Sequence, residues 1–327
     1  LMKKILVIRF SSIGDVVLTS PVIRCIKNQI EGAEIHYLTK QLFIHLLENN
    51  PFLSKTFGFD DNFNSLIKEL KIEKYDFVID LHKNIRSKRF ISALKVTSAS
   101  VNKMNLSKWM MVNANKKAQI PSIVDRYLDT VNELKVINDN QGLDFFLTEI
   151  EKNASLKLPL DFQKEYIAFA IGATYDGKKM SASKSREIIT NLAVPVVLLG
   201  DKTDLEKGDF IADKLTNVYN ACGEFSIRES AGLLYNSALV IAHDSGLMHI
   251  ATALQKPLIT IWGCTTPSLG MAPYLPNNLS VIIEPLGRDK RPCSKLGNRC
   301  KYSENCIEKV ENSSIVSSIN ELINQLK

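Results

Sequence analysis

Short apolar runs that favour β-strands alternate along this chain with segments of helical period. In the first half the alternation runs over residues 5–8, 15–30, 35–38, 41–49, 77–81 and 85–94, the strand-like run coming first in each pair. Strands separated by helices in this way form parallel, doubly wound sheets. The pattern therefore predicts an α/β fold whose first half is a Rossmann-like domain.

A second series of the same kind follows a polar stretch. Asn, Asp, Gln, Lys and a proline cluster between about residues 136 and 164, around one apolar run at 143–147, which indicates a linker. Beyond it, strand-like runs predict a second Rossmann-like domain, at residues 166–171, 196–199, 218–220, 239–242 and 258–261. Helical spacing near the end of the chain places five apolar residues on one face: Ile315, Ile319, Leu322, Ile323 and Leu326.

The length of 327 residues fits two domains of ordinary size. We place the first domain at residues 2–150, the second at 160–305 and a C-terminal helix at 306–327. Doubly wound domains bind ligands at the carboxyl ends of their strands, where strand order reverses. We therefore expect the functional residues in strand-to-helix loops.

Charge balance and apolar stretches exclude several classes of protein. Lys and Arg number 41 against 35 Asp and Glu, a net charge of +6 that favours anionic partners but is too small to indicate nucleic acid. The longest apolar stretches, such as residues 192–200, are well short of the roughly 20 residues that span a bilayer. From Met2 the chain enters a predicted strand without a signal-peptide pattern, which predicts a cytoplasmic protein.

The first predicted strand ends in Arg-Phe-Ser-Ser-Ile-Gly-Asp, residues 9–15, and a helix follows. Asp15 lies in the first helical turn, where a carboxylate stabilises the helix N-terminus, so one interpretation is a capping role. The other interpretation is a general base. Deprotonating a sugar hydroxyl requires a carboxylate held at the edge of a cleft, and the first loop of a doubly wound domain lies at such an edge. A dinucleotide site is disfavoured, since Gly-x-Gly-x-x-Gly is absent from the sequence.

In the second half, a predicted strand leads into His-Asp-Ser-Gly-Leu-Met-His, residues 243–249, and then into a helix. Backbone amides at the helix start, the Ser245 hydroxyl and the close approach allowed by Gly246 form a pattern suited to a diphosphate. His249 lies one turn beyond Ser245 and can face the same anion. Asp244 is better placed to accept hydrogen bonds from sugar hydroxyls. The alternative interpretation makes Asp244 a helix cap and His249 a core residue.

Together these motifs resemble glycosyltransferase family 9, the bacterial lipopolysaccharide heptosyltransferases, over nearly the whole chain. Residues 11–15 match the family's Ser-Ser-x-Gly-Asp, whose Asp is regarded as the catalytic base, and residues 244–249 match its donor motif Asp-Thr-Gly-Leu-x-His. The resemblance implies the GT-B fold, in which two Rossmann-like domains face each other across a cleft, with acceptor on the first and nucleotide sugar on the second. It assigns Asp15 as the base, an acceptor role to Ser11, Ser12 and Gly14, and a donor role to Asp244, Ser245, Gly246, Leu247 and His249.

Family members also carry a lysine, usually followed by Trp-Pro, that neutralises the donor diphosphate. Here the segment reads Lys-Lys-Met-Ser without Trp-Pro, and spacing to the following helix favours Lys178 as the catalytic lysine, with Lys179 as a second donor contact. A solvated basic loop is the alternative. Asp204 is expected near the donor ribose. The family's Gly-Pro-Thr-Asp-Pro loop is replaced by Gly-Cys-Thr-Thr-Pro at 263–267, which leaves the nucleobase open.

On the acceptor side, a basic segment follows the predicted strand at 77–81. Four cations fall within residues 83–89, which indicates contacts to an acidic glycan, although charge clusters are usually solvated helix faces. Arg126 belongs to a further segment that resembles the family. The residues expected to bind the acceptor here are Lys83, Arg86, Lys88 and Arg126.

Of the six cysteines, Cys293, Cys300 and Cys306 form a group that resembles a cysteine-rich segment of the family. A disulfide scaffold is unexpected in a chain of this size. Three thiols without a nearby His leave a tetrahedral site one ligand short. We therefore predict neither a metal nor a cofactor.

The resemblance implies an inverting, metal-independent transfer of a heptose from a nucleotide diphosphate, with ADP-heptose as the expected donor, to an acidic lipopolysaccharide-core acceptor. Asp15 takes the acceptor proton, while Lys178, the amides before His249 and His249 itself stabilise the departing diphosphate. Such an acceptor implies peripheral contact with the inner membrane surface. Two alternatives stay open: a GT-B enzyme with another donor, such as a UDP-sugar transferase or an epimerase, and a non-catalytic glycan-binding relative.

Overall fold

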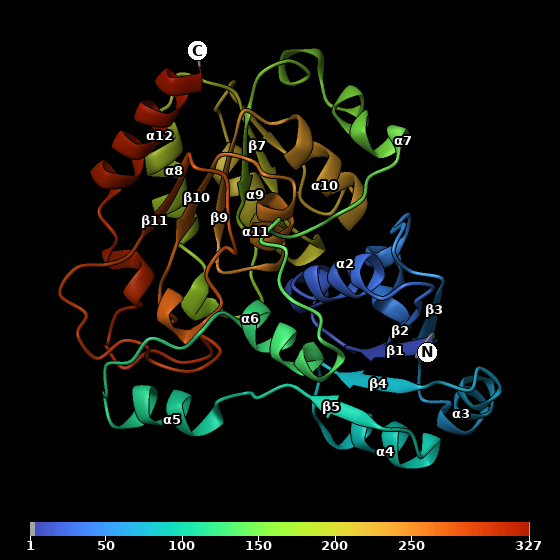
Figure 1. The fold of residues 1–327 in the computed structure, drawn as a ribbon. Helices are drawn as coiled ribbons and strands as arrows, with labels where there is room; N and C mark the ends of the chain where they lie inside the picture. Colours follow the sequence, from blue (N-terminus) through green and yellow to red (C-terminus); the bar gives the residue numbers. More distant parts are fainter. Residues whose placement is uncertain (1–3, 327) are drawn as a thin grey trace. The chain divides into compact units, whose positions relative to one another are not determined.

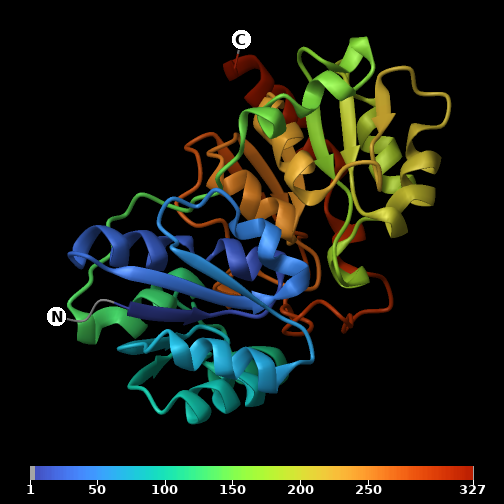
Figure 2. The same ribbon diagram turned by 90° about the vertical axis from the view of Figure 1, so that its right-hand side faces the viewer.

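The computed structural model describes residues 4–326, which divide into two compact units (Figure 1). The first unit contains the residues up to Lys103 together with Pro121–Phe146, and the second contains Met104–Ile120 and the residues from Leu147 onward. Each unit has a parallel sheet with helices on both faces (Figure 2). The α/β architecture predicted from the alternating pattern is confirmed.

Five parallel strands form the sheet of the first unit, in the order β3-β2-β1-β4-β5. Ile8, the last residue of β1, lies opposite Leu38 of β2 and opposite Asp80 of β4. Strand order reverses between β1 and β4, so their carboxyl ends form the switch point at which such sheets bind ligands. The strands are β1 (Lys4–Ile8), β2 (Glu34–Lys40), β3 (Lys55–Phe59), β4 (Phe77–Asp80) and β5 (Ser98–Ser100).

Of the three helical segments predicted in the first unit, the one at 85–94 is confirmed and two differ, and α3, α6 and η2 were not predicted. The expected helix at 15–30 is two helices, because the chain turns after Val17 and restarts with Pro21 in the first turn, where a missing N–H costs nothing. The expected helix at 41–49 is a 3₁₀ helix. The elements are α1 (Ile13–Val17), α2 (Ser20–Gln29), η1 (Gln41–Leu47), α3 (Phe63–Ile72), α4 (Ile85–Leu94), α6 (Ile123–Leu128) and η2 (Asp129–Leu134).

Six parallel strands form the sheet of the second unit, in the order β11-β10-β9-β6-β7-β8. Here the order reverses between β6 and β9. The central strands β6, β7, β9 and β10 are buried throughout, as strands covered on both faces must be. The strands are β6 (Ile167–Ala170), β7 (Val196–Leu199), β8 (Val218–Asn220), β9 (Leu239–His243), β10 (Leu258–Ile261) and β11 (Ser280–Ile283).

The last helix, α12 (Asn312–Leu326), packs on the second unit through the predicted face. Four of the five predicted residues join the core, whereas Leu326 is exposed because it lies in the final turn. The other helical elements of this unit are α5 (Asn105–Asn113), α7 (Glu149–Lys152), η3 (Ala154–Lys157), η4 (Leu160–Phe162), η5 (Asp176–Lys178), α8 (Ala182–Thr190), η6 (Lys202–Asp204), α9 (Leu205–Ala212), α10 (Ile227–Asn236), α11 (Gly246–Ala253), η7 (Pro267–Leu269) and η8 (Cys306–Lys309).

The division of the chain differs from the predicted ranges in two places. Residues 104–120, which lie inside the predicted first domain, belong to the second unit, where Met111 and Ile120 pack against Leu269. The predicted polar linker also differs, because its first part packs on the first unit. Arg24 on α2 is buried and donates hydrogen bonds to the carboxylates of Asp139 and Asp144, so this stretch is held on the first unit by ion pairs.

Among residues 4–326, no helix combines the length and the apolar character needed to cross a membrane.

Candidate active site

Asp15 lies at the carboxyl edge of the first sheet, in the first turn of α1. Its Oδ2 accepts hydrogen bonds from the backbone N–H of Ser12 (3.3 Å) and from the Ser12 hydroxyl (3.1 Å), and it lies 2.6 Å from Nη2 of Arg9. Arg9 is fixed in turn, because Nε donates to the Ser11 carbonyl and Nη1 to the Leu81 carbonyl, both at 2.7 Å. The carboxylate therefore has the capping contacts of the first interpretation and a fixed position beside β1 and β4.

The charge state of Asp15 follows from these partners. Burial alone raises the pKa of Asp15, but the Arg9 guanidinium and the hydrogen bonds from Ser12 outweigh burial and hold the pKa below its ordinary value. With its side chain 22% exposed, Asp15 is an accessible carboxylate that is ionised at neutral pH. Burial raises the pKa of the neighbouring Tyr37 and Tyr127, so both rings stay neutral beside the pair.

Arg126, predicted on the acceptor side, is buried in α6 of the same unit. It donates from Nε to the Pro121 carbonyl (3.1 Å) and from Nη1 to the Asn102 carbonyl (3.2 Å). Within residues 4–326, its Nη2 has no hydrogen-bond partner. Burial lowers the pKa of Arg126, because it disfavours the charged form of the guanidinium. An anionic ligand group bound at Nη2 would stabilise that charge.

His82 follows β4 and is absent from the predicted site. Its ring meets Phe10 edge-on, with 5.2 Å between ring centroids, and burial followed by the Arg9 charge lowers the pKa of His82 to about 3. Nδ1 of this neutral ring is buried without a hydrogen-bond partner in the described part of the chain. Only the pairing of β1 with β4, which the sequence does not reveal, brings His82 close to Arg9 and Asp15.

The basic segment keeps its charges in solvent. The turn into α4 is fixed by Asp80, whose Oδ1 accepts from the backbone N–H groups of His82 (3.0 Å) and Lys83 (2.7 Å). Arg89 lies over the Phe63 ring, with Cζ 4.3 Å from its centroid, and so covers apolar surface. The three cations predicted to contact the acceptor are exposed: Lys83, Arg86 and Lys88.

In the second unit, Lys178 and Asp244 form a largely buried ion pair. Lys178 Nζ lies 2.7 Å from Asp244 Oδ2, and the two side chains are 17% and 8% exposed. Thr265 Oγ1 donates to the same carboxylate oxygen at 2.8 Å. Lys178 lies in the loop after β6, Asp244 directly after β9 and Thr265 in the loop after β10, so the loops that follow three strands meet at this oxygen. Asp244 Oδ2 thus holds Lys178, and the expected hydrogen bonds from sugar hydroxyls to Asp244 stay a prediction.

Helix α11 begins at Gly246, two residues after Asp244. Ser245 is the residue before its first turn, and within residues 4–326 the buried Ser245 Oγ has no hydrogen-bond partner. The first amides of an α-helix have no acceptor within the helix and carry partial positive charge. Together with Lys178 beside Asp244, these groups supply donors and positive charge for a phosphate. Gly246 opens the helix as predicted.

Further along α11, Leu247 is partly exposed and His249 is buried. A donor contact for either residue stays a prediction.

His243, the last residue of β9, is a second residue that sequence reasoning did not assign a role. It is fully buried, and its Nε2 accepts from the backbone N–H of Met180 at 3.5 Å. Burial, followed by the charges of Lys207 and Lys179, lowers the pKa of His243 to about 3, so the ring is a neutral acceptor. His243 therefore fixes the segment that immediately follows the two candidate lysines.

Asp204 and Lys179 lie on the β7 side of the switch point. Asp204 is buried in η6. Its carboxylate lies against Gly172 in the loop after β6, where a Cβ on residue 172 would come within 2.3 Å of Asp204 Oδ2. Only glycine at this position leaves room for the carboxylate. Burial, reinforced by Asp201, raises the pKa of Asp204. Lys179 Nζ lies 3.3 Å from exposed Asp176, so Lys178 is the lysine that reaches Asp244.

The prediction that the cysteine group lacks a fourth ligand is wrong. Cys264, which follows β10, joins Cys293, Cys300 and Cys306, and the four Sγ atoms all lie within 4.8 Å of one another. A group of Glu34, His36 and Glu73 also has metal-ligand composition, but Lys4 and Lys55 pair with its carboxylates. The thiols are therefore the stronger candidate for a metal site.

Two doubly wound parallel sheets, each with charged residues at its switch point, are the architecture of the GT-B class of glycosyltransferases. Residues 63–301 match glycosyltransferase family 9 (heptosyltransferase), and the chain belongs to this family. It is 26% identical to lipopolysaccharide heptosyltransferase 1 of Campylobacter coli, with 98% of each chain covered. It is also 26% identical to lipooligosaccharide heptosyltransferase 2 of Haemophilus influenzae, over 85% of this chain and 88% of the relative.

Solved structures agree in fold. The E. coli ADP-heptose lps heptosyltransferase II superposes with a TM-score of 0.74 at 20% identity, over 98% of this chain and 99% of that chain. The E. coli heptosyltransferase WaaC, solved with ADP, gives a TM-score of 0.69 at 21% identity with the same coverage.

The depressed pKa of Asp15 predicts how stability depends on pH. A carboxylate whose pKa is lower in the folded than in the unfolded state stabilises the fold above its unfolded pKa, and this stabilisation is lost as pH falls through the folded pKa. Asp15→Asn should therefore melt below the wild type at pH 7, and the difference should shrink below about pH 4. Exposed Asp61→Asn is the control, with little difference at either pH. A gap for Asp15→Asn that persists undiminished at pH 3 would show that Arg9 does not stabilise the carboxylate.

Proposed function

We propose that this chain transfers a heptose from ADP-heptose to an acidic lipopolysaccharide-core acceptor, with inversion at the anomeric carbon and without a metal ion at the reacting centre. The observation that carries the proposal is the Lys178–Asp244 pair at the start of α11. A lysine ammonium held beside free helix amides supplies the positive charge that a departing diphosphate requires. Membership of a heptosyltransferase family supports the sugar, and the relative solved with ADP supports the nucleotide.

Asp15 is the proposed base. As the acceptor oxygen attacks the anomeric carbon, its proton passes to Asp15 Oδ1 or Oδ2, the new carbon–oxygen bond forms and the bond to the diphosphate breaks. The negative charge leaves with the nucleoside diphosphate, where Lys178 and the α11 amides stabilise it. Attack from the face opposite the leaving group inverts the configuration. Arg9 keeps Asp15 ionised, and Arg126 offers to an anionic acceptor its Nη2 group, which has no hydrogen-bond partner among residues 4–326.

An acidic glycolipid acceptor also explains the exposed basic segment on α4. Cations at a membrane surface attract anionic headgroups and glycans through long-range electrostatics. We infer from this that the enzyme contacts the inner membrane peripherally through the acceptor, without a spanning segment of its own among the described helices.

The first test addresses the base. Asp15→Asn removes the proton acceptor and keeps the side-chain size, so kcat should fall about 10²- to 10⁴-fold. The dissociation constant for ADP should change little, because the proposed donor residues all lie in the second unit. Exposed Asp61→Asn should retain wild-type turnover. A folded Asp15→Asn enzyme that binds ADP and turns over within a few fold of the wild type would place the base elsewhere.

A second test separates the two lysines. Lys178→Ala should lower kcat by about 10²-fold or more, the usual effect of losing one preorganised charge at a leaving group. Lys179→Ala, one residue on, should have a much smaller effect, and exposed Lys164→Ala none. Wild-type activity should survive a brief EDTA treatment. Activity that is lost to EDTA and returns with Mg²⁺ but not with Zn²⁺ would contradict a metal-free diphosphate site.

A third test concerns the acceptor. Arg86→Ala should raise the KM for the acceptor and leave donor binding unchanged, and the difference from the wild type should shrink at high salt because screening weakens exposed charges. Lys68→Ala, an exposed charge on α3 of the same unit, is the matched control. Acceptor kinetics that are the same for Arg86→Ala and Lys68→Ala would remove the basic segment from the site.

A further inference from the structure

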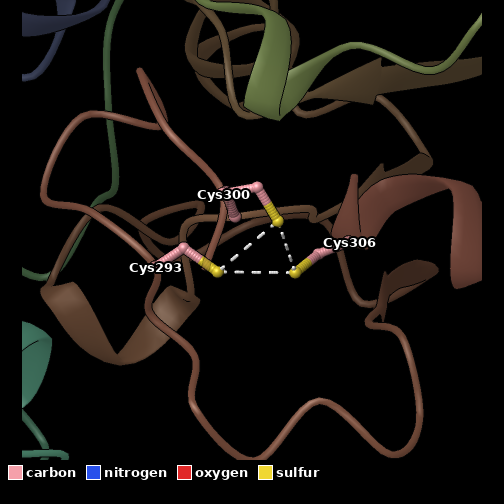
Figure 3. Close-up of side chains that lie close together, drawn as sticks. Cys293, Cys300 and Cys306 are labelled. Carbon is pink, nitrogen blue, oxygen red and sulfur yellow. Dashed lines mark hydrogen bonds between the residues drawn. The ribbon is translucent and has the colours of Figure 1, made fainter. Parts of the chain in front are cut away.

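Four thiols from separate parts of the second unit meet at one point. The thiol cluster consists of Cys264 after β10, Cys293 and Cys300 in the loop beyond β11, and Cys306 at the start of η8. The Sγ atoms of Cys293 and Cys306 are 3.4 Å apart, those of Cys300 and Cys306 3.5 Å, and those of Cys293 and Cys300 3.9 Å (Figure 3). None of the four is in a disulfide.

These separations match a metal site better than other roles for cysteine. Ligands at about 2.3 Å from a central ion, the usual zinc–sulfur distance, lie about 3.8 Å from one another in a tetrahedron. A disulfide requires sulfur atoms about 2.0 Å apart. As apolar packing the arrangement is poor, because the cluster forms a small core of its own, and in the described chain Tyr302 is its only partly buried hydrophobic neighbour that is not a cysteine. Thiols are weak hydrogen-bond donors and gain little from one another.

We propose that Cys264, Cys293, Cys300 and Cys306 bind one metal ion, zinc or iron, through four thiolates. A tetrahedral set of four sulfur ligands selects these metals over Mg²⁺ or Ca²⁺, which take oxygen ligands. With four protein ligands the ion has no open position, so the site is structural and takes no direct part in chemistry. Three of the four cysteines are buried and Cys300 is partly exposed, which gives a metal or a chelator one approach.

The thiol cluster is joined to the loop that carries Lys178. Cys264 N–H donates to the Gly177 carbonyl at 2.8 Å, and Gly177 N–H donates to the Gly297 carbonyl at 3.0 Å. Asn305 connects the same parts, since its Nδ2 donates to the Asp176 carbonyl at 2.7 Å and its Oδ1 lies 3.2 Å from Cys264 Sγ. The loop before Lys178 is therefore held by the backbone next to the ligands.

Two glycines make this close packing possible. A Cβ on Gly177 would lie 2.3 Å from the Gly297 carbonyl oxygen and 3.0 Å from Cys264 Sγ. Gly297 has a φ of +81°, and a Cβ there would lie 2.7 Å from Lys178 Cγ. The cysteine-containing loop thus packs against the Lys178 side chain itself. Loss of the metal should loosen this loop and weaken ADP binding, a consequence that rests on the proposed donor role of Lys178.

The test is metal analysis of the full chain, purified without chelator from cells supplied with zinc and iron. We expect about one metal ion per chain, released when an organomercurial titrates the thiols. Zinc gives a colourless protein whose cobalt-substituted form shows tetrahedral thiolate absorption, and iron gives thiolate charge-transfer bands directly. Cys300→Ser, which changes the most exposed ligand, should lose the metal, whereas Cys222→Ala, a buried cysteine outside the cluster, should keep it. The proposal would be overturned if the purified wild type contained no metal although its cysteines were intact, that is, if all six thiols reacted as free thiols after unfolding.

ADP titration separates this proposal from the proposed function. Cys300→Ser should bind ADP about tenfold more weakly than the wild type, which is the lower end of the loss in metal affinity or activity when the surroundings of a metal site are changed. Metal-loaded wild type that fails to bind ADP would refute the donor assignment and leave the metal site standing. A metal-free Cys300→Ser variant with unchanged ADP affinity would refute the link between the thiol cluster and Lys178.

Discussion

Parallel strand pairing is the constraint on which both sites depend. It brings the carboxyl ends of neighbouring strands to one edge, so that residues distant in sequence meet where strand order reverses. In the first unit β1 and β4 bring Arg9 and Asp15 beside the Leu81 carbonyl and His82. In the second unit β6, β9 and β10 bring Lys178, Asp244 and Thr265 to one carboxylate oxygen. The position of each candidate residue in its site therefore depends on the order of the strands as well as on the local sequence.

The charges at these edges are balanced in a way that suits their proposed chemistry. An isolated charge removed from water is costly, so Asp15 is paired with Arg9, and Lys178 with Asp244. Pairing keeps Asp15 ionised, as a general base must be. Pairing also fixes the position of Lys178, as a residue that binds a diphosphate requires. Beside these pairs, Ser245 Oγ and Arg126 Nη2 are buried without a hydrogen-bond partner in residues 4–326, and both are suited to polar groups of a ligand.

Sequence reasoning succeeded where the signal is local. Strands buried on both faces appear in the sequence as apolar runs, and helices α1 and α11 begin where the two motifs predict them. The roles of the residues in these motifs stay predictions. It failed where the signal is not local. The edge strands β3, β5 and β11 were not predicted, because β3 and β5 lack a continuous apolar run and the Val-Ile-Ile run of β11 is only three residues long. Cys264 was not grouped with the other thiols, and His82 was not placed beside Asp15, since only the folded sheets bring them together. Ile120 packs against Leu269 for the same reason, so the predicted first domain included residues of the second unit.

The claim of inverting transfer from ADP-heptose is tested most directly by analysing the product. The purified enzyme is incubated with an acidic lipopolysaccharide-core acceptor and, in parallel, with ADP-heptose and with UDP- and GDP-linked sugars, and the new glycosidic bond is examined by NMR. We predict product from ADP-heptose alone, with the anomeric configuration opposite to that of the donor. A product that keeps the donor configuration, or efficient transfer from a UDP- or GDP-sugar in place of ADP-heptose, would contradict the account.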